Sequence, residues 1–359
     1  MMDRRALFGV FAAALAGAAL TSPHAAAAQE LHVLNWQGYG TDEQWAVELF
    51  EQQTGVKVVH DYFNSEQEML TKLRTSPGTY DVVLINSSFT GAAAEEGLIQ
   101  PIDPAAIGNF GDLSEKMRTS PYLNIDGKLY GVAWVWGVTS FAYNTGKVSP
   151  APSSIAALWD PAHAGHVGWR DDAVEAVQLA AIATGQDMNE PADMDKIREK
   201  LMALKPQIKT FWSSEDEWNK YAAAGDFDIA VYWSGSAERS KKTFSLPVEF
   251  VIPDEGAMVF MDTLVIPKDA PNLDIAYKLI GQATSAEGQK VIADNLTQAI
   301  ITKAALPVID AKNKEIYQYD NLAKLFEKAR FYPFWPLEPE GDFVVFDQVL
   351  EEYQRFLKA

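Results

Sequence analysis

Short apolar runs alternate with amphipathic stretches in the first part of the chain. Residues 31–36, 56–62 and 81–85 read as strands, and the last run is apolar almost throughout, as a strand buried on both faces requires. The stretches between them read as helices, because Thr41 and Ser65 each begin a capping box. This alternation predicts a parallel sheet with helices on both faces.

The same alternation resumes after residue 128, so the expected fold class is α/β. A chain of 359 residues usually forms two domains, and no flexible linker separates them here. We therefore expect two domains that are joined by crossing strands. The later expected elements are an extended segment 129–143, helices 173–183, 274–282 and 343–357, and strands 228–232, 248–252 and 264–266.

The first 28 residues have the order of an export signal. Arg4 and Arg5 precede an apolar run over 6–20, and small residues over 25–28 then form a cleavage site near Ala28. The arginine pair is also typical of twin-arginine export. A membrane anchor is the alternative, but about 15 apolar residues are short for a span of roughly 20. We expect cleavage and a periplasmic protein, a class that includes binding proteins, hydrolases and redox proteins.

Composition removes several classes of function. The chain contains no cysteine, which excludes disulfides, thiol catalysis, cysteine metal sites and the lipid-anchoring cysteine of bacterial lipoproteins. Its formal net charge of −19 argues against nucleic acid, because phosphate binding needs a basic surface. The charge is compatible with a cationic ligand, although many secreted bacterial proteins are acidic.

Aromatic, acidic and polar residues gather directly after the expected strands. Ligands of α/β sheets bind outside the carboxyl ends of the strands, so these positions form the candidate site. Aromatic faces attract cations, and carboxylates accept charge-assisted hydrogen bonds from them. Arg170 is the one basic residue there that could point inward. The candidates are the aromatics Trp36, Tyr39, Trp233 and Phe260, the acids Asp172, Glu175 and Asp262, and the polar residues Gln37, Asn86 and Ser88.

Each acid also has a structural interpretation. Asp171 and Asp172 begin a helix, and we expect Asp171 to cap it while Asp172 faces a ligand. Glu175, three residues further on, shares the helix face of Asp172. Asp262 lies in an apolar run and needs a partner, which is either a ligand cation or a structural group.

Enzyme chemistry finds little support in the sequence. His163 and His166 share one loop, but no helix fixes their spacing for a metal. Nucleophile-elbow, phosphate-loop, dinucleotide and HExxH motifs are missing, and no adjacent tyrosine pair suits ferric ion. Asp172, Glu175 and Asp262 could act as the acids of a glycosidase, but nothing else favours that reaction. We expect no catalytic residue, metal or cofactor.

Ordered motifs over most of residues 29–359 resemble the bacterial spermidine/putrescine-binding proteins, which are periplasmic receptors of polyamine ABC transporters. They begin with Asn-Trp-Gln-Gly-Tyr at 35–39 and end with Val-Ile-Pro-Asp-Glu-Gly at 251–256. As an ordered set they are specific for the receptor class and less specific for the ligand. The other matching segments are 50–58, 80–88, 96–103, 136–139, 158–161, 171–175 and 233–236.

The resemblance implies the type II periplasmic binding fold, in which two α/β lobes are joined by crossing strands and clamp the ligand between them. Lobe 1 would comprise 29–136 and 261–302, and lobe 2 would comprise 137–260 and 303–359. It further implies a monomer that closes on a polyamine and delivers it to an ABC transporter permease in the inner membrane. The crossings would lie near Trp136, Phe260 and Thr302.

The resemblance also implies roles for individual residues. Aromatic walls would hold the aliphatic chain of a polyamine, acids would bind its ammonium groups, and polar residues would make further contacts. The walls would be Trp36, Trp233 and Phe260, the acids Asp172, Glu175 and Asp262, and the further contacts Gln37, Tyr39, Asn86, Ser88 and Gln298.

Three positions depart from the family pattern. Gly38 stands where the family usually has an acid, Gln298-Ala299 where it has Tyr-Pro, and Ile85-Asn86 where it has Pro-Ser. One acid and one aromatic ring are therefore missing or replaced, which weakens the case for spermidine and leaves a shorter diamine or a related amine equally open. An amino-acid derivative or a sugar stays open within the receptor class, and a secreted hydrolase is the remote alternative.

Overall fold

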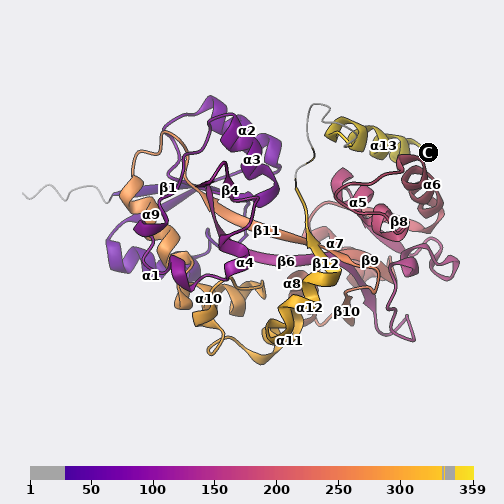
Figure 1. Cartoon of the computed structure of the whole chain (residues 1–359). Coiled ribbons are helices and arrows are strands. Elements are labelled where there is room, and N and C mark those ends of the chain that lie inside the picture. The colour runs from indigo at the N-terminus through magenta and orange to yellow at the C-terminus, as the bar shows by residue number, and fades with distance from the viewer. Residues whose placement is uncertain (1–28, 334, 336–343) are drawn as a thin grey trace, which may run out of the picture.

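The computed structural model describes residues 29–333, 335 and 344–359, so the export signal expected over 1–28 lies outside the described residues. The described chain is built on one mixed sheet of ten strands that helices cover (Figure 1). Two further short strands, β4 (Asn124–Ile125) and β5 (Lys128–Leu129), pair only with each other. In this part of the chain, no helix is both long and apolar enough to cross a membrane.

The ten strands form two parallel groups on either side of an antiparallel centre. They are β1 (Glu30–Asn35), β2 (Lys57–Tyr62), β3 (Val82–Asn86), β6 (Gly131–Asn144), β7 (Val167–Arg170), β8 (Ile208–Trp212), β9 (Ile229–Trp233), β10 (Val248–Val251), β11 (Ala257–Val265) and β12 (Ala329–Phe331). The order across the sheet is β2-β1-β3-β11-β6-β9-β7-β8. Outside that path, β10 pairs with β6 and β12 pairs with β11.

The described part of the chain contains thirteen α-helices. The helices expected over 173–183 and 274–282 are confirmed as α5 and α9, and the C-terminal helix begins at residue 346, while the expected start at 343 lies outside the described residues. The helices are α1 (Gln44–Thr54), α2 (Glu66–Thr75), α3 (Thr90–Glu95), α4 (Glu115–Arg118), α5 (Ala173–Ala183), α6 (Met194–Leu204), α7 (Glu215–Ala224), α8 (Ser234–Phe244), α9 (Leu273–Ala283), α10 (Ala286–Leu296), α11 (Ala311–Tyr317), α12 (Leu322–Lys328) and α13 (Phe346–Lys358).

Two long strands, β6 and β11, run antiparallel through the centre and join the two ends of the sheet (Figure 1). β11 pairs with β3 on one side, and β6 pairs with β9 on the other. β11 is buried along its whole length, which explains why its sequence is apolar apart from Asp262 and Thr263. The long extended segment expected over 129–143 is confirmed as β6. Both β6 and β11 contribute to both ends of the molecule.

Apolar cores lie at both ends. At one end, Val33 and Val132 belong to a core that also contains Tyr317 and Leu325. At the other end, α13 packs against α5 and α6 (Figure 1). Phe356 of α13 lies in the core there. The exact lobe boundaries fall within continuous strands at 136/137 and 260/261, and they stay a prediction.

The capping box expected at Thr41 is wrong, whereas the one at Ser65 is confirmed as a helix cap. Helix α1 begins after Glu43, which makes no side-chain cap, because Thr41 Oγ1 instead accepts a hydrogen bond from Asn35 Nδ2 at 2.5 Å. Ser65 Oγ accepts the backbone N–H of Glu68 at 3.2 Å and caps α2. A hydroxyl near a strand end thus has competing partners that the local pattern does not reveal.

Candidate functional site

Asp262 is the central acid of the candidate site at the β1–β3 end of the sheet. It lies opposite Asn86 in the ladder between β11 and β3, and only 5% of the residue is exposed. Its carboxylate accepts hydrogen bonds from the Tyr39 hydroxyl at 2.7 Å and from Asn86 Nδ2 at 3.1 Å. Burial raises the pKa of Asp262 to about 6, although both hydrogen bonds favour the charged form.

Tyr39 connects this acid to an aromatic wall. Its hydroxyl also accepts a hydrogen bond from Gln298 Nε2 at 3.3 Å, and its ring centroid lies 5.6 Å from that of Trp36. Burial, with the neighbouring Asp262, raises the pKa of Tyr39 well above its ordinary value, so the phenol stays neutral and donates. The ends of β1 and β3, the middle of β11 and the turn after α10 therefore bring together Trp36, Tyr39, Asn86, Asp262 and Gln298.

Asn86 joins two further residues to this group. Its side-chain oxygen accepts hydrogen bonds from the Ser88 backbone N–H at 3.1 Å and from Ser88 Oγ at 2.7 Å. Its backbone N–H donates to Glu66 Oε1 at 3.0 Å. Asn86 therefore has its amide oxygen occupied by Ser88 and its amide nitrogen directed at Asp262, which orients the side chain.

Glu66 is a residue of this group that the sequence analysis missed. It is the first residue of α2, and its second carboxylate oxygen is buried without a hydrogen-bond partner among the described residues. Burial raises the pKa of Glu66 well above its ordinary value, and the charge of Asp262 adds to the shift. Its position directly after the Ser65 cap identified it only as part of a helix start. The signal that could have found it is an acid just beyond the carboxyl end of the second strand.

Asp172 corrects one expectation at the other end of the sheet. It is the N-cap of α5, because its carboxylate accepts the backbone N–H of Glu175 at 2.9 Å. Asp171, expected to be the cap, instead accepts a hydrogen bond from the Tyr353 hydroxyl of α13 at 2.6 Å. The expectation was wrong by one residue, because Asp172 keeps an extended backbone and the helix begins only at Ala173.

Glu175 is buried in a cluster with an arginine and a tryptophan. Its Oε1 bonds to Nη1 of Arg170 and lies 3.4 Å from Trp233 Nε1, while Oε2 has no partner among the described residues. The guanidinium of Arg170 lies 4.7 Å from the centroid of the Trp233 ring, and its Nη1 is 3.7 Å from Asp172 Oδ2. Burial raises the pKa of Glu175 to about 7, because Arg170 offsets it only in part and Asp172 adds to it.

Phe260 and Gln37 differ in how the structure places them. Phe260 is largely buried, and its ring lies so close to the backbone of Gly137 that a Cβ there would overlap it. Gln298 Oε1 approaches the same glycine, so Phe260 and Gln298 meet at the crossing strands. Gln37 is exposed in the loop after β1.

Tyr332 is a second residue that the sequence analysis missed. It follows β12, and burial raises its pKa well above the ordinary value, with further contributions from Glu175, Asp172 and Asp262. The negative charges of acids in both groups therefore disfavour ionisation of this phenol. The segment after Phe331 has no strand or helix pattern that could have placed Tyr332 there.

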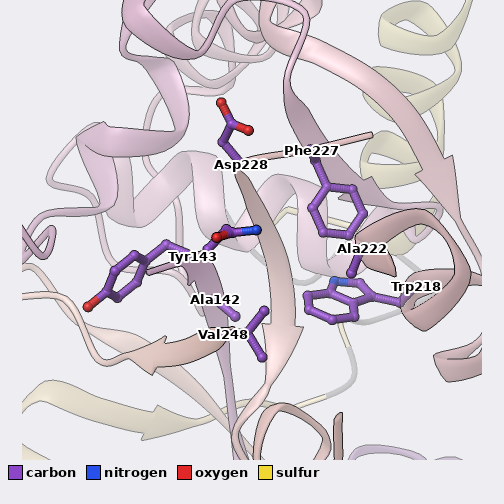
Figure 2. A pocket seen from close by; sticks show the side chains of 8 residues that line it. Ala142, Tyr143, Trp218, Ala222, Phe227, Asp228 and Val248 are labelled. Carbon is purple, nitrogen blue, oxygen red and sulfur yellow. The ribbon is translucent and has the colours of Figure 1, made fainter. Parts of the chain in front are cut away.

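Two cavities of the described structure lie away from these residues. The smaller, about 10 Å³, has room for about one water and lies between Tyr143, Trp218, Phe227 and Val248 (Figure 2). The larger, about 290 Å³, lies between α8, β10 and α11. His163 and His166 take part in no metal-binding cluster of three or more ligands among the residues described.

Comparison with known proteins decides the family. The profile described as bacterial extracellular solute-binding protein matches residues 45–319, which is most of the chain. The chain belongs to this family. Relatives of this solute-binding protein have nearly its own length, and their matches to it cover both ends of the sheet.

Curated relatives of the chain are named after their ligands, and two of them serve as examples. The spermidine/putrescine-binding periplasmic protein of Salmonella typhimurium is 30% identical over 95% of this solute-binding protein and 94% of its own length. The putrescine-binding periplasmic protein PotF of Escherichia coli is 28% identical over 90% of this chain and 93% of its own.

A solved structure confirms the fold. The spermidine/putrescine ABC transporter substrate-binding protein PotD of Streptococcus pneumoniae aligns with a TM-score of 0.79 at 22% identity, covering 92% of this chain and 99% of its own. The expected type II periplasmic binding protein fold is therefore correct for this solute-binding protein.

Proposed function

We propose that this solute-binding protein captures a polyamine-like cation, of the putrescine or spermidine class, in the periplasm and delivers it to an ABC transporter permease. Two lines of evidence support the proposal. The relatives named above bind putrescine or spermidine by name. The described site combines aromatic rings with buried carboxylates, which is the chemistry that an alkylammonium ligand requires.

Asp262 is the observation that carries the proposal. It is 5% exposed, and its two hydrogen-bond donors, Tyr39 and Asn86, are both neutral. No ion pair of the described residues includes it. A buried carboxylate without a cation is costly, so a ligand ammonium group would supply the missing charge.

The group around Trp233 and Glu175 would receive the other end of the ligand. Glu175 Oε2 is buried and unpaired among the described residues, and Trp233 presents a ring beside it. Phe260 and Trp36 would then contact the methylene chain between the two ends. Each charge-assisted hydrogen bond contributes about 1.5–3 kcal/mol, and together with the aromatic contacts these bonds would oppose the ordering costs of binding.

The remaining features of the proposal concern export and mode of action. Residues 1–28 would be removed near Ala28, and the absence of cysteine would leave the protein without a lipid anchor. The protein would act as a monomer that binds and releases its ligand unchanged. Closure of the two lobes on the ligand would create the surface that the permease recognises.

Thermal unfolding against a ligand panel tests the proposal. The panel contains putrescine, spermidine, spermine, choline, amino acids, opine-like amines and sugars. A ligand that binds only the folded protein raises its stability by about 2.7 kcal/mol at a hundredfold excess over Kd. We expect a raised midpoint with polyamines alone. A shift only with amino acids, opine-like amines or sugars would overturn the polyamine and keep the receptor, and turnover of a panel compound would overturn the receptor.

A further inference from the structure

Arg170 occupies a position where an aromatic ring and two carboxylates surround a cation. It ends β7, and 26% of its side chain is exposed. Its guanidinium lies over the ring of Trp233, bonds to Glu175 and is close to Asp172. An aromatic face with two carboxylates is the arrangement expected for a ligand ammonium group, and here the chain supplies a cation of its own.

This guanidinium changes the charge of the site. With both carboxylates ionised, the cluster of Arg170, Asp172 and Glu175 retains one net negative charge instead of two. Asp262 supplies one more at the other end of the site. The other buried arginine nearby, Arg239, adds no net charge because it is paired with Glu215. Burial raises the pKa of Glu66 and favours its neutral form, and with Glu66 neutral the ionised site matches two positive charges and has no carboxylate left for a third.

We propose that Arg170 determines ligand specificity: its guanidinium takes the position of one ammonium group, so that the site accepts a diamine in preference to a triamine. This inference rests on the proposed function, because it presumes that the ligand is a polyamine. Like charges in a partly desolvated site repel strongly, so a triamine would place an ammonium group against the guanidinium.

A purely structural role for Arg170 predicts something different. The ion pair with Glu175 also satisfies a buried acid, and its loss would destabilise the protein whatever the ligand. Stability alone therefore cannot separate the two roles. The ratio of the affinities for putrescine and spermidine can, because a structural defect weakens both ligands alike while a charge effect changes their ratio.

Isothermal titration with putrescine and spermidine at about pH 8, where Glu175 is ionised, provides the test. We expect the unaltered protein to bind putrescine more tightly. Arg170→Gln restores the second negative charge and should move the affinity ratio toward spermidine by at least about tenfold. Arg170→Lys keeps the charge and should keep the original ratio.

Two further variants guard against trivial outcomes. The double variant R170Q/E175Q has the same net charge as the original cluster and should restore the original ratio. It also removes the buried carboxylate that R170Q leaves unpaired, so it can be measured if R170Q alone folds poorly. Arg198→Gln removes an arginine that pairs with Glu352, on α6 and α13, and should leave the ratio unchanged. Two results would overturn the assignment of Arg170. One is an R170Q variant with an unchanged ratio of putrescine to spermidine affinity. The other is a double variant whose ratio moves toward spermidine. If the unaltered protein binds neither polyamine, the proposed function itself fails.

Discussion

At the scale of residues, the two buried acids of the site differ in what balances their charge. Glu175 faces the guanidinium of Arg170, whereas Asp262 faces only the neutral donors Tyr39 and Asn86. Both have a raised pKa because burial outweighs their partners. Asp262 therefore depends more on a bound cation than Glu175 does.

Asp262→Asn should weaken polyamine binding by at least about tenfold, because it removes one charge-assisted hydrogen bond. The variant keeps the shape of the side chain and should fold. Titration calorimetry with putrescine measures the loss.

Asp81→Asn is the matched control for this change. Asp81 is also a buried aspartate at the same end of the sheet, but it accepts hydrogen bonds from the backbone N–H groups of His32 and Asn272, away from the site. The Asp81→Asn variant should lower the stability of the fold and leave the affinity for putrescine unchanged. Unaltered putrescine affinity in D262N would remove Asp262 from the site.

At the scale of elements, the sequence predicted the parts that depend on periodic burial. β3 and β6 were recognisable because strands buried on both faces are mostly apolar, α9 because its apolar positions repeat at helical spacing, and α5 because a mostly apolar run follows two acids that suit a helix start. The cap of α5 was misplaced by one residue, since both Asp171 and Asp172 suit that position and only the contact of Asp171 with Tyr353 separates them.

The site was predictable in part for the same reason. Residues near strand ends, such as Tyr39 and Asn86, were found because parallel strands bring their carboxyl ends together, whereas Asp262 lies in the middle of the antiparallel strand β11. Glu66 and Tyr332 were missed because their positions depend on contacts between segments far apart in the sequence, which no local pattern encodes. The pairing of Arg170 with Glu175 within the cluster likewise required the structure.

Ser65→Ala should lower the free energy of unfolding by about 1 kcal/mol, because Ser65 Oγ satisfies a free N–H group at the start of α2. Ser114→Ala is the matched control, because Ser114 precedes α4 without a side-chain cap. Urea unfolding of both variants measures the difference. Equal losses would contradict the assignment of Ser65 as a cap.

At the scale of the whole molecule, β6 and β11 run through both ends of the sheet (Figure 1). Asp262 lies on β11 beside β3, and Glu175 lies on α5. Two other interactions link segments across this region. Arg239 of α8 donates to the carbonyl of Leu296 at the end of α10, and the charges of acids in both groups raise the pKa of Tyr332. Protonation, ligand binding and global stability should therefore be coupled.

The stabilisation that putrescine confers should be larger at about pH 8 than at about pH 5. Folding raises the pKa of Asp262 to about 6 and that of Glu175 to about 7, so the folded protein holds these protons longer than the unfolded chain. From about pH 4 to about pH 7, these two groups therefore make the unfolding free energy fall as pH rises. A bound dication favours both ionised forms, lowers both pKa values and opposes that fall.

The charged or titratable neighbours are Tyr39, Glu66 and Tyr332 for Asp262, and Arg170, Asp172 and Tyr332 for Glu175.

Thermal unfolding with and without putrescine at both pH values measures this coupling. Other acids of the protein have lowered pKa values and give the opposite trend, so the difference between bound and free protein is the informative quantity. Calorimetry at about pH 6 in two buffers of different ionisation enthalpy should detect protons released on binding, as the raised pKa values require. The variant D262N/E175Q lacks both groups and should release none. Proton uptake, or an equal ligand shift at both pH values, would mean that the ammonium groups bind elsewhere.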